Sequence, residues 1–209
     1  MEILQVSRKI TILDRILLLV AGLLAAYQVG FGIDSHTLLP QICYTIAFGV
    51  VMVASLLIII LGFEILDSPL VVVGSTIIPL FISLGLVAQF FPLWLTYYSV
   101  FVVLSFLSII AARLLDGKRS KVISVIIGHG ISGLIIFLSP LILSLSSKTP
   151  ALFSFVGIGG ALIGVTGTLL AFLRLGKPIL TGNKILAILP CILLIMMISF
   201  IVGFSVLTG

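Results

Sequence analysis

Seven uninterrupted apolar runs, each long enough to cross a lipid bilayer, constrain this chain more than any other feature. The hydrocarbon core of a bilayer is about 30 Å thick, and an α-helix needs roughly 20 residues to cross it. The runs cover nearly the whole sequence, which predicts a single polytopic membrane domain over residues 1–209. They occupy residues 14–34, 40–63, 69–91, 93–113, 122–146, 150–173 and 184–207.

Composition and patterning together predict the type of membrane structure. Of the 209 residues, 61% are hydrophobic and only 8% are charged, which leaves too few polar side chains to cover a soluble globule. In lipid the backbone amides must be hydrogen bonded within the structure, and these runs are continuous rather than alternately apolar and polar. The sequence therefore predicts an all-α integral membrane protein, a bundle of seven transmembrane helices.

The shortest break between runs lies at Phe90-Phe91-Pro92. As one helix, residues 69–113 would be about 67 Å long at 1.5 Å per residue, more than twice the thickness of the hydrocarbon core. The chain is therefore expected to turn back at this proline.

The basic residues predict the orientation of the bundle, because lysine and arginine concentrate in cytoplasmic loops. With the N-terminus in the cytoplasm and the C-terminus outside, ten of the eleven basic residues fall on the cytoplasmic side, and only Lys148 falls outside. We expect a multi-pass protein of the cell membrane in this N-in, C-out orientation, with Asp34 and His36 facing the exterior.

Two weak internal repeats suggest different plans for the bundle. The segments GLVAQFFPL and GLIIFLSPL, which begin at Gly85 and Gly133, suggest helical hairpins followed by a seventh helix. A shift of 110 residues instead places Pro40 on Pro150, which suggests two parallel three-helix units joined by a single helix, a 3+1+3 arrangement. Repeats of the second kind are common in transporters, with the solute path at the repeat interface.

The sixth run contains GIGGALIGVTG, in which Gly160 and Gly164 form a GxxxG pair. Small residues four positions apart allow two membrane helices to approach closely. Both glycines are therefore predicted to be helix-packing residues.

Chemistry that needs acids, metals or bound groups is not indicated. The acidic residues Asp14, Glu64, Asp67 and Asp116 all lie at predicted cytoplasmic ends or loops, so coupled ion transport is disfavoured. The two cysteines do not form a CxxC pair, and the basic residues are spread over three loops. We therefore expect no enzymatic activity, no metal, no cofactor and no nucleic-acid partner.

His129 is the one ionisable residue of the stretch VISVIIGHGISGLIIF at residues 122–137. Counted in residues from the predicted cytoplasmic ends of the helices, several polar residues lie at a similar depth in the inner half of the bundle. The solute-path candidates among them are Ser75, Thr76, His129 and Ser132. In the outer half the candidates are Gln28 and Gln89, since a primary amide in hydrocarbon must find hydrogen-bond partners. Tyrosines at that depth, which include Tyr44 and Tyr98, are expected to form an interfacial belt.

Two functions fit these features. The first is an uncoupled facilitator or channel for a small solute or ion, with a path between the helices past Gln28, Gln89 and His129. The alternative is a non-catalytic accessory or assembly subunit of a larger membrane complex. The expected partners are the lipid bilayer and, beyond it, other membrane subunits or further copies of the chain. Inward-facing Gln28, Gln89, His129 and Ser132 would favour the facilitator.

Overall fold

The computed structural model describes residues 8–33, 37–114, 118–174 and 179–207, and this part of the chain is helical without strands. Seven of its helices are long and apolar enough to cross a membrane, which confirms the predicted all-α bundle of seven transmembrane helices. The protein is therefore a multi-pass membrane protein. The long helices are α1 (Ile12–Phe31), α2 (Leu38–Leu61), α3 (Pro69–Phe90), α4 (Leu95–Leu114), α5 (Lys118–Leu145), α6 (Ser154–Arg174) and α7 (Gly182–Phe204).

Local chemistry sets the ends of α1 and α2 a few residues before the predicted ends. Thr11 caps α1, because its side chain accepts a hydrogen bond from the Asp14 amide and the Asp14 carboxylate accepts one from the Thr11 amide. Gly32 and Gly62 end α1 and α2 at φ angles of 75° and 78°, a backbone conformation that glycine adopts without steric cost.

Two short connections separate neighbouring spans. After Gly62 the chain forms a 3₁₀-helix, η1 (Phe63–Asp67), before it enters α3. Between α3 and α4 the chain turns back through Phe91 and a second 3₁₀-helix, η2 (Pro92–Trp94), so the expected break at Phe90-Phe91-Pro92 is confirmed.

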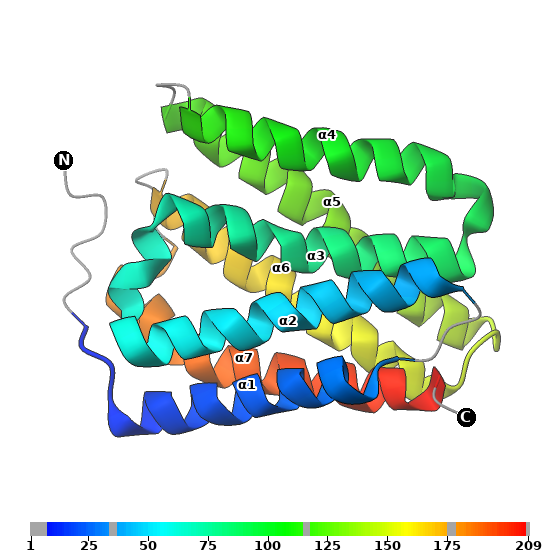
Figure 1. Ribbon diagram of the computed structural model, residues 1–209, viewed down its shortest axis with the longest axis horizontal. Coiled ribbons are helices and arrows are strands. Elements are labelled where there is room, and N and C mark those ends of the chain that lie inside the picture. The colour runs from blue at the N-terminus through cyan, green and yellow to red at the C-terminus, as the bar shows by residue number, and fades with distance from the viewer. Residues whose placement is uncertain (1–7, 34–36, 115–117, 175–178, 208–209) are drawn as a thin grey trace.

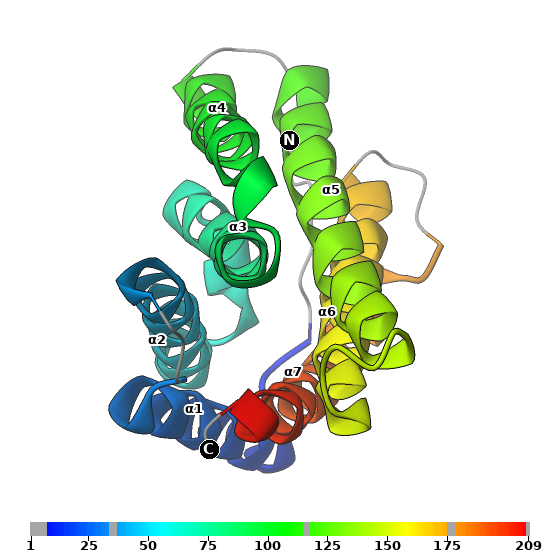
Figure 2. The ribbon, with the colours of Figure 1, turned by 90° about the vertical axis from the view of Figure 1, so that its right-hand side faces the viewer.

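Six of the seven helices form a closed ring. Helices α1, α2 and α3 pack in a row, α5, α6 and α7 pack in a second row, and the rows meet where α3 contacts α5 and where α1 contacts α7. Figure 1 shows the helices running side by side, and Figure 2 looks along them into the ring. Helix α4 lies outside the ring and packs mainly against α3 and α5.

The contacts between helices can be compared with the two repeat plans suggested by the sequence. A 3+1+3 plan predicts two three-helix units with one helix left over, which is the grouping that α1–α3, α4 and α5–α7 form. In a plan of successive hairpins, α3 and α4 would be a primary pair, yet α3 also packs extensively against α2 and α5. The arrangement of the helices therefore favours the 3+1+3 plan, while the duplication itself stays a prediction.

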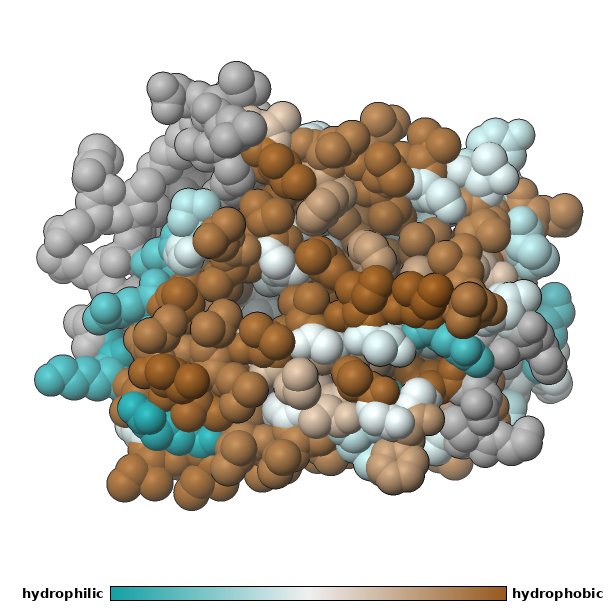
Figure 3. Space-filling view, viewed as in Figure 1, coloured by the Kyte–Doolittle hydropathy of each residue, from teal (hydrophilic) through white to brown (hydrophobic). Residues whose placement is uncertain are grey.

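All seven long helices expose large apolar side chains on the outside of the bundle, as lipid contact requires. The view in Figure 3 is dominated by hydrophobic residues, and the hydrophilic ones gather toward the two ends. In Figure 1 helix α1 begins at one end of the bundle and helix α7 finishes at the opposite end, and we call these two ends of the bundle the N-terminal end and the C-terminal end. Which end faces the cytoplasm stays a prediction. Asp34, His36 and the loops at 115–117 and 175–178, on which part of that prediction rests, lie outside the described residues.

Candidate functional site: an apolar cavity inside the helix ring

A partly open cavity of about 220 Å³ lies within the ring, toward the N-terminal end of the bundle. Its walls come from α2, η1 and α3 on one side and from α5, α6 and α7 on the other. The cavity therefore lies between the two three-helix rows. Its wall is formed by aliphatic and aromatic side chains, with three polar exceptions, which are Ser75, His129 and Thr166.

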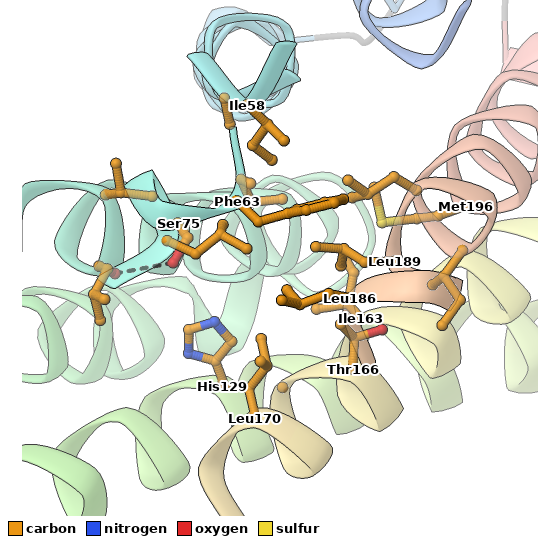
Figure 4. Close-up of a pocket in the computed structure, with 18 of the residues that line it drawn as sticks. Ile58, Phe63, Ser75, His129, Ile163, Thr166, Leu170, Leu186, Leu189 and Met196 are labelled. Atoms are coloured by element: carbon orange, nitrogen blue, oxygen red, sulfur yellow. Dashed lines mark hydrogen bonds between the residues drawn. The ribbon is translucent and has the colours of Figure 1, made fainter. Parts of the chain in front are cut away.

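His129 is the most polar group that faces this space. Its ring projects from α5 toward Ser75 of α3 (Figure 4). The Nδ1 atom is buried and makes no well-formed hydrogen bond to any described residue, although the Val125 carbonyl one turn earlier lies close enough to interact with the ring. Gly167 of α6 packs against the other side, where a Cβ atom would lie 3.5 Å from the His129 ring. The imidazole is thus held by packing rather than by a hydrogen-bond network.

The two hydroxyl groups of the wall are already committed as donors. Ser75 Oγ donates to the Val72 carbonyl at 2.9 Å, and Thr166 Oγ1 donates to the Leu162 carbonyl at 2.8 Å. Each hydroxyl oxygen keeps lone pairs that can accept a further hydrogen bond. Toward a molecule in the cavity, Ser75 and Thr166 can therefore act only as acceptors unless they give up these bonds.

Phe63 of η1 forms part of the cavity wall and is only 1% exposed. Behind it, the Arg8 guanidinium stacks on the Phe63 ring at 5.2 Å, donates to the Leu186 carbonyl at 3.1 Å and pairs with Asp14 at 2.9 Å. Sequence reasoning missed this group. The available signal was an aromatic residue, Phe63, directly after Gly62 at the end of the second predicted run.

An aromatic cluster fills the ring on the C-terminal side of the cavity. Phe204 packs against Tyr44 at 4.8 Å and Phe153 at 6.2 Å between ring centroids, and Phe48 packs against Phe200 at 5.7 Å. Met196, one turn before Phe200, lines the cavity and belongs to the same core cluster. The cavity therefore ends where the aromatic cluster begins.

The structure places the six predicted solute-path residues in separate environments. Only Ser75 and His129 line the cavity. Thr76 is fully buried and donates to the Val73 carbonyl, and Ser132 is fully buried against α4. In the outer half, Gln28 is 5% exposed and Gln89 accepts a hydrogen bond from the Tyr44 hydroxyl at 3.0 Å. All six are inward-facing or partly buried, but the aromatic cluster separates the two amides from His129.

Tyr44 and Tyr98 are buried, 1% and 9% exposed, so the prediction that they belong to an interfacial belt is wrong. Tyr98 of α4 donates to Ser83 Oγ of α3 at 2.8 Å, and its hydroxyl lies 3.3 Å from Ser132 Oγ of α5. Both tyrosines find a hydroxyl or amide partner inside the protein, which replaces the water that an interfacial position would offer.

Tyr98→Phe is expected to lower the free energy of unfolding by about 1–2 kcal/mol, because it removes a hydroxyl that contacts two buried serines. The matched control is Tyr97→Phe, since Tyr97 is the neighbouring residue and is 74% exposed. Thermal or denaturant unfolding of both variants in the same detergent measures the difference. Equal stabilities would mean that the Tyr98 hydroxyl does not hold α4 on the ring.

The predicted GxxxG pair divides into two different sites. A Cβ atom on Gly160 would lie 2.6 Å from Ile136 Cγ2 and 2.8 Å from the Ile136 backbone carbon, so α5 and α6 touch at this glycine. A Cβ atom on Gly164 would meet nothing within 4 Å. The contact in the other direction is closer, because a Cβ atom on Gly133 of α5 would lie 3.7 Å from the Gly164 Cα. Gly160 is therefore the one of the two at which α5 leaves no space for a side chain.

Comparison of the chain with protein families, with curated proteins and with solved structures finds no match in any of the three. The cavity and the helix ring around it are therefore the features from which a function is inferred.

Proposed function

We propose that the protein is an uncoupled facilitator that carries a small solute through the cavity between its two three-helix rows. The observation that carries the proposal is the cavity itself, which is lined by five helices and η1 and faced by the His129 ring. The buried position of Gln28, which is 5% exposed, supports it further, because a helix face that met only lipid would not bury this amide.

The distribution of acidic side chains supports a mechanism without ion coupling. Coupled carriers usually place a carboxylate within the membrane, where it binds the driving ion. Among the described residues, Asp14, Glu64 and Asp67 all lie at the N-terminal end of the bundle, and none of them lines the cavity. In this proposal the solute moves down its own gradient.

Two groups of side chains limit the cavity, one on each side along the helix axes. In this proposal each group must move aside in turn for a solute to pass. The aromatic cluster around Phe48, Phe200 and Phe204 bounds the C-terminal side. Phe63, supported by Arg8, bounds the N-terminal side. Since the cavity lies between the two rows, a small rotation of one row against the other would loosen one boundary at a time.

Filling the cavity is expected to abolish facilitated flux. Ala54→Phe places a phenyl ring in the cavity wall, whereas Val53→Phe, at the neighbouring residue, adds the same ring at a site that is 49% exposed on the lipid side. The measurement is vesicle swelling with a panel of short-chain polyols, alkanediols and amides, each compared with empty vesicles. We expect wild type and Val53→Phe to accelerate at least one solute and Ala54→Phe to accelerate none.

The result that contradicts the facilitator is the absence of acceleration for every solute in wild-type vesicles. The accessory-subunit function would then be favoured, and it makes its own prediction. The protein purified from its native membrane should carry another membrane protein in a fixed ratio, and Ala54→Phe should not reduce that ratio.

A further inference from the structure

The hydrogen-bonding pattern of the cavity indicates what kind of molecule it accepts. The inference rests on the proposed function in so far as the same cavity would hold the transported solute. Binding itself depends on three properties of the cavity, which are the charge of its wall, its volume and the free hydrogen-bond donors and acceptors that face it.

No residue that lines the cavity carries a formal charge, since aspartate, glutamate, lysine and arginine are missing from the described wall. The ion pair of Arg8 and Asp14 lies behind Phe63 and is not part of the wall. Its two charges neutralise each other, and Arg8 also donates a hydrogen bond to the Leu186 carbonyl. A charged ligand would lose its hydration and meet no counter-charge, which is costly in a membrane interior. The ligand is therefore uncharged.

The volume of the cavity limits the size of the ligand. An apolar protein cavity of about 150 Å³ holds a benzene molecule, so a cavity of about 220 Å³ holds about nine non-hydrogen atoms on the same scale. Leu186, Leu189 and Met196 face this space together in Figure 4, and they offer an apolar wall to most of such a molecule.

The polar groups of the wall favour a ligand that donates hydrogen bonds. The hydroxyl groups of Ser75 and Thr166 donate to backbone carbonyls of their own helices, so toward a ligand they can only accept. In the neutral tautomer that carries its proton on Nδ1, the His129 ring offers Nε2 as a further acceptor, and this ring projects toward Ser75 in Figure 4. These three acceptors face a ligand while the wall offers no free side-chain donor of its own in that state.

We propose that the cavity binds a small uncharged amphiphile, with a short apolar body along α7 and a polar end that donates hydrogen bonds to His129 Nε2 and the Ser75 hydroxyl. Short-chain diols, unionised amines and amides belong to this class. Ligands of the same size that only accept hydrogen bonds, or that carry a charge, bind more weakly.

Photolabelling with a diazirine-bearing pentane-1,2-diol, which has nine non-hydrogen atoms, tests the proposal directly. After irradiation of the protein in detergent, adducts are mapped by peptide mass spectrometry, with and without an excess of competitor. We expect adducts on the cavity-facing residues of α3, α5 and α7. Unlabelled pentane-1,2-diol should suppress these adducts, whereas its dimethyl ether, which cannot donate, and pentylammonium, which is charged, should suppress them far less.

Two variants connect the labelling to particular atoms. His129→Leu removes the imidazole acceptor and is expected to weaken binding about two- to tenfold, while His129→Gln supplies an amide oxygen and is expected to restore part of the loss. Ala54→Phe leaves His129 in place and should remove the cavity adducts by occupying their space. It therefore serves as the decisive variant if His129→Leu does not fold.

The proposal is overturned if adducts form equally on lipid-facing residues without competition, or if the dimethyl ether competes as well as the diol. Binding and transport can fail separately. Competed cavity adducts without accelerated flux would leave the binding site in place and remove the facilitator, whereas flux without such adducts would keep a facilitator and remove this ligand class.

Discussion

Gly160→Ala is expected to lower the free energy of unfolding by about 1–3 kcal/mol, the usual cost of forcing extra atoms into a packed interface. A Cβ atom at this position would come within 2.8 Å of the Ile136 backbone carbon, and a backbone atom cannot rotate away as a side chain can. Helices α5 and α6 would have to separate along one of the most extensive contacts of the ring. Denaturant titration of the protein in mixed micelles measures the change.

Gly164→Ala is the matched control, because it makes the same chemical change one turn later in the same motif. Nothing lies within 4 Å of a Cβ atom at Gly164, so we expect a change within about 0.5 kcal/mol, or a slight gain from the higher helix propensity of alanine. If both variants lost the same stability, the GxxxG pair would act as a unit and the close contact at Ile136 would not decide the effect.

Asp14→Asn is expected to cost about 2–4 kcal/mol, because it leaves the Arg8 guanidinium without its ionic partner in a largely buried site. The Asp14 side chain is only 4% exposed, and its carboxylate accepts hydrogen bonds from Arg8 and from both the amide and the hydroxyl of Thr11. The variant therefore weakens the cap of α1 as well as the support behind Phe63.

Glu64→Gln is the control for this prediction, since Glu64 is an exposed acid on η1 at the same end of the bundle. We expect it to change stability by no more than about 0.5 kcal/mol. A double-mutant cycle of Arg8→Gln and Asp14→Asn isolates the pair itself. A coupling energy near zero would show that the two side chains stabilise α1 independently and do not act as an ion pair.

The sequence predicted the number of spans because the length of an apolar run is a direct physical requirement of the bilayer. It did not predict the helix order in the ring. Inside a membrane the lipid is as apolar as leucine, so a helix need not show a polar side where it leaves the bundle. Tyr98 illustrates this limit, because a tyrosine in a span fits the interface and the interior equally well until its partners Ser83 and Ser132 are known.

The candidate site was predicted in part for a similar reason. His129 was identified because an ionisable side chain in a long apolar run is unusual, and it does face the cavity. Sequence depth also grouped Ser132 with it, but depth gives the height of a residue along the helix and not the direction of its side chain. Ser132 is three residues further along α5 and turns toward α4, while His129 turns into the ring.

The position of α4 outside the ring has a consequence for how the chain could be rearranged. A row of three helices starts and ends at opposite faces of the membrane, so two rows that run in the same direction need one extra crossing to be joined, and α4 is that crossing. Helices α1 and α7 are already neighbours, but α1 begins at one end of the bundle and α7 ends at the other. A circularly permuted chain that links the end of α7 to the start of α1 would therefore need a new transmembrane segment as its linker. Given such a segment, α4 could be cut without changing the order of helices around the cavity.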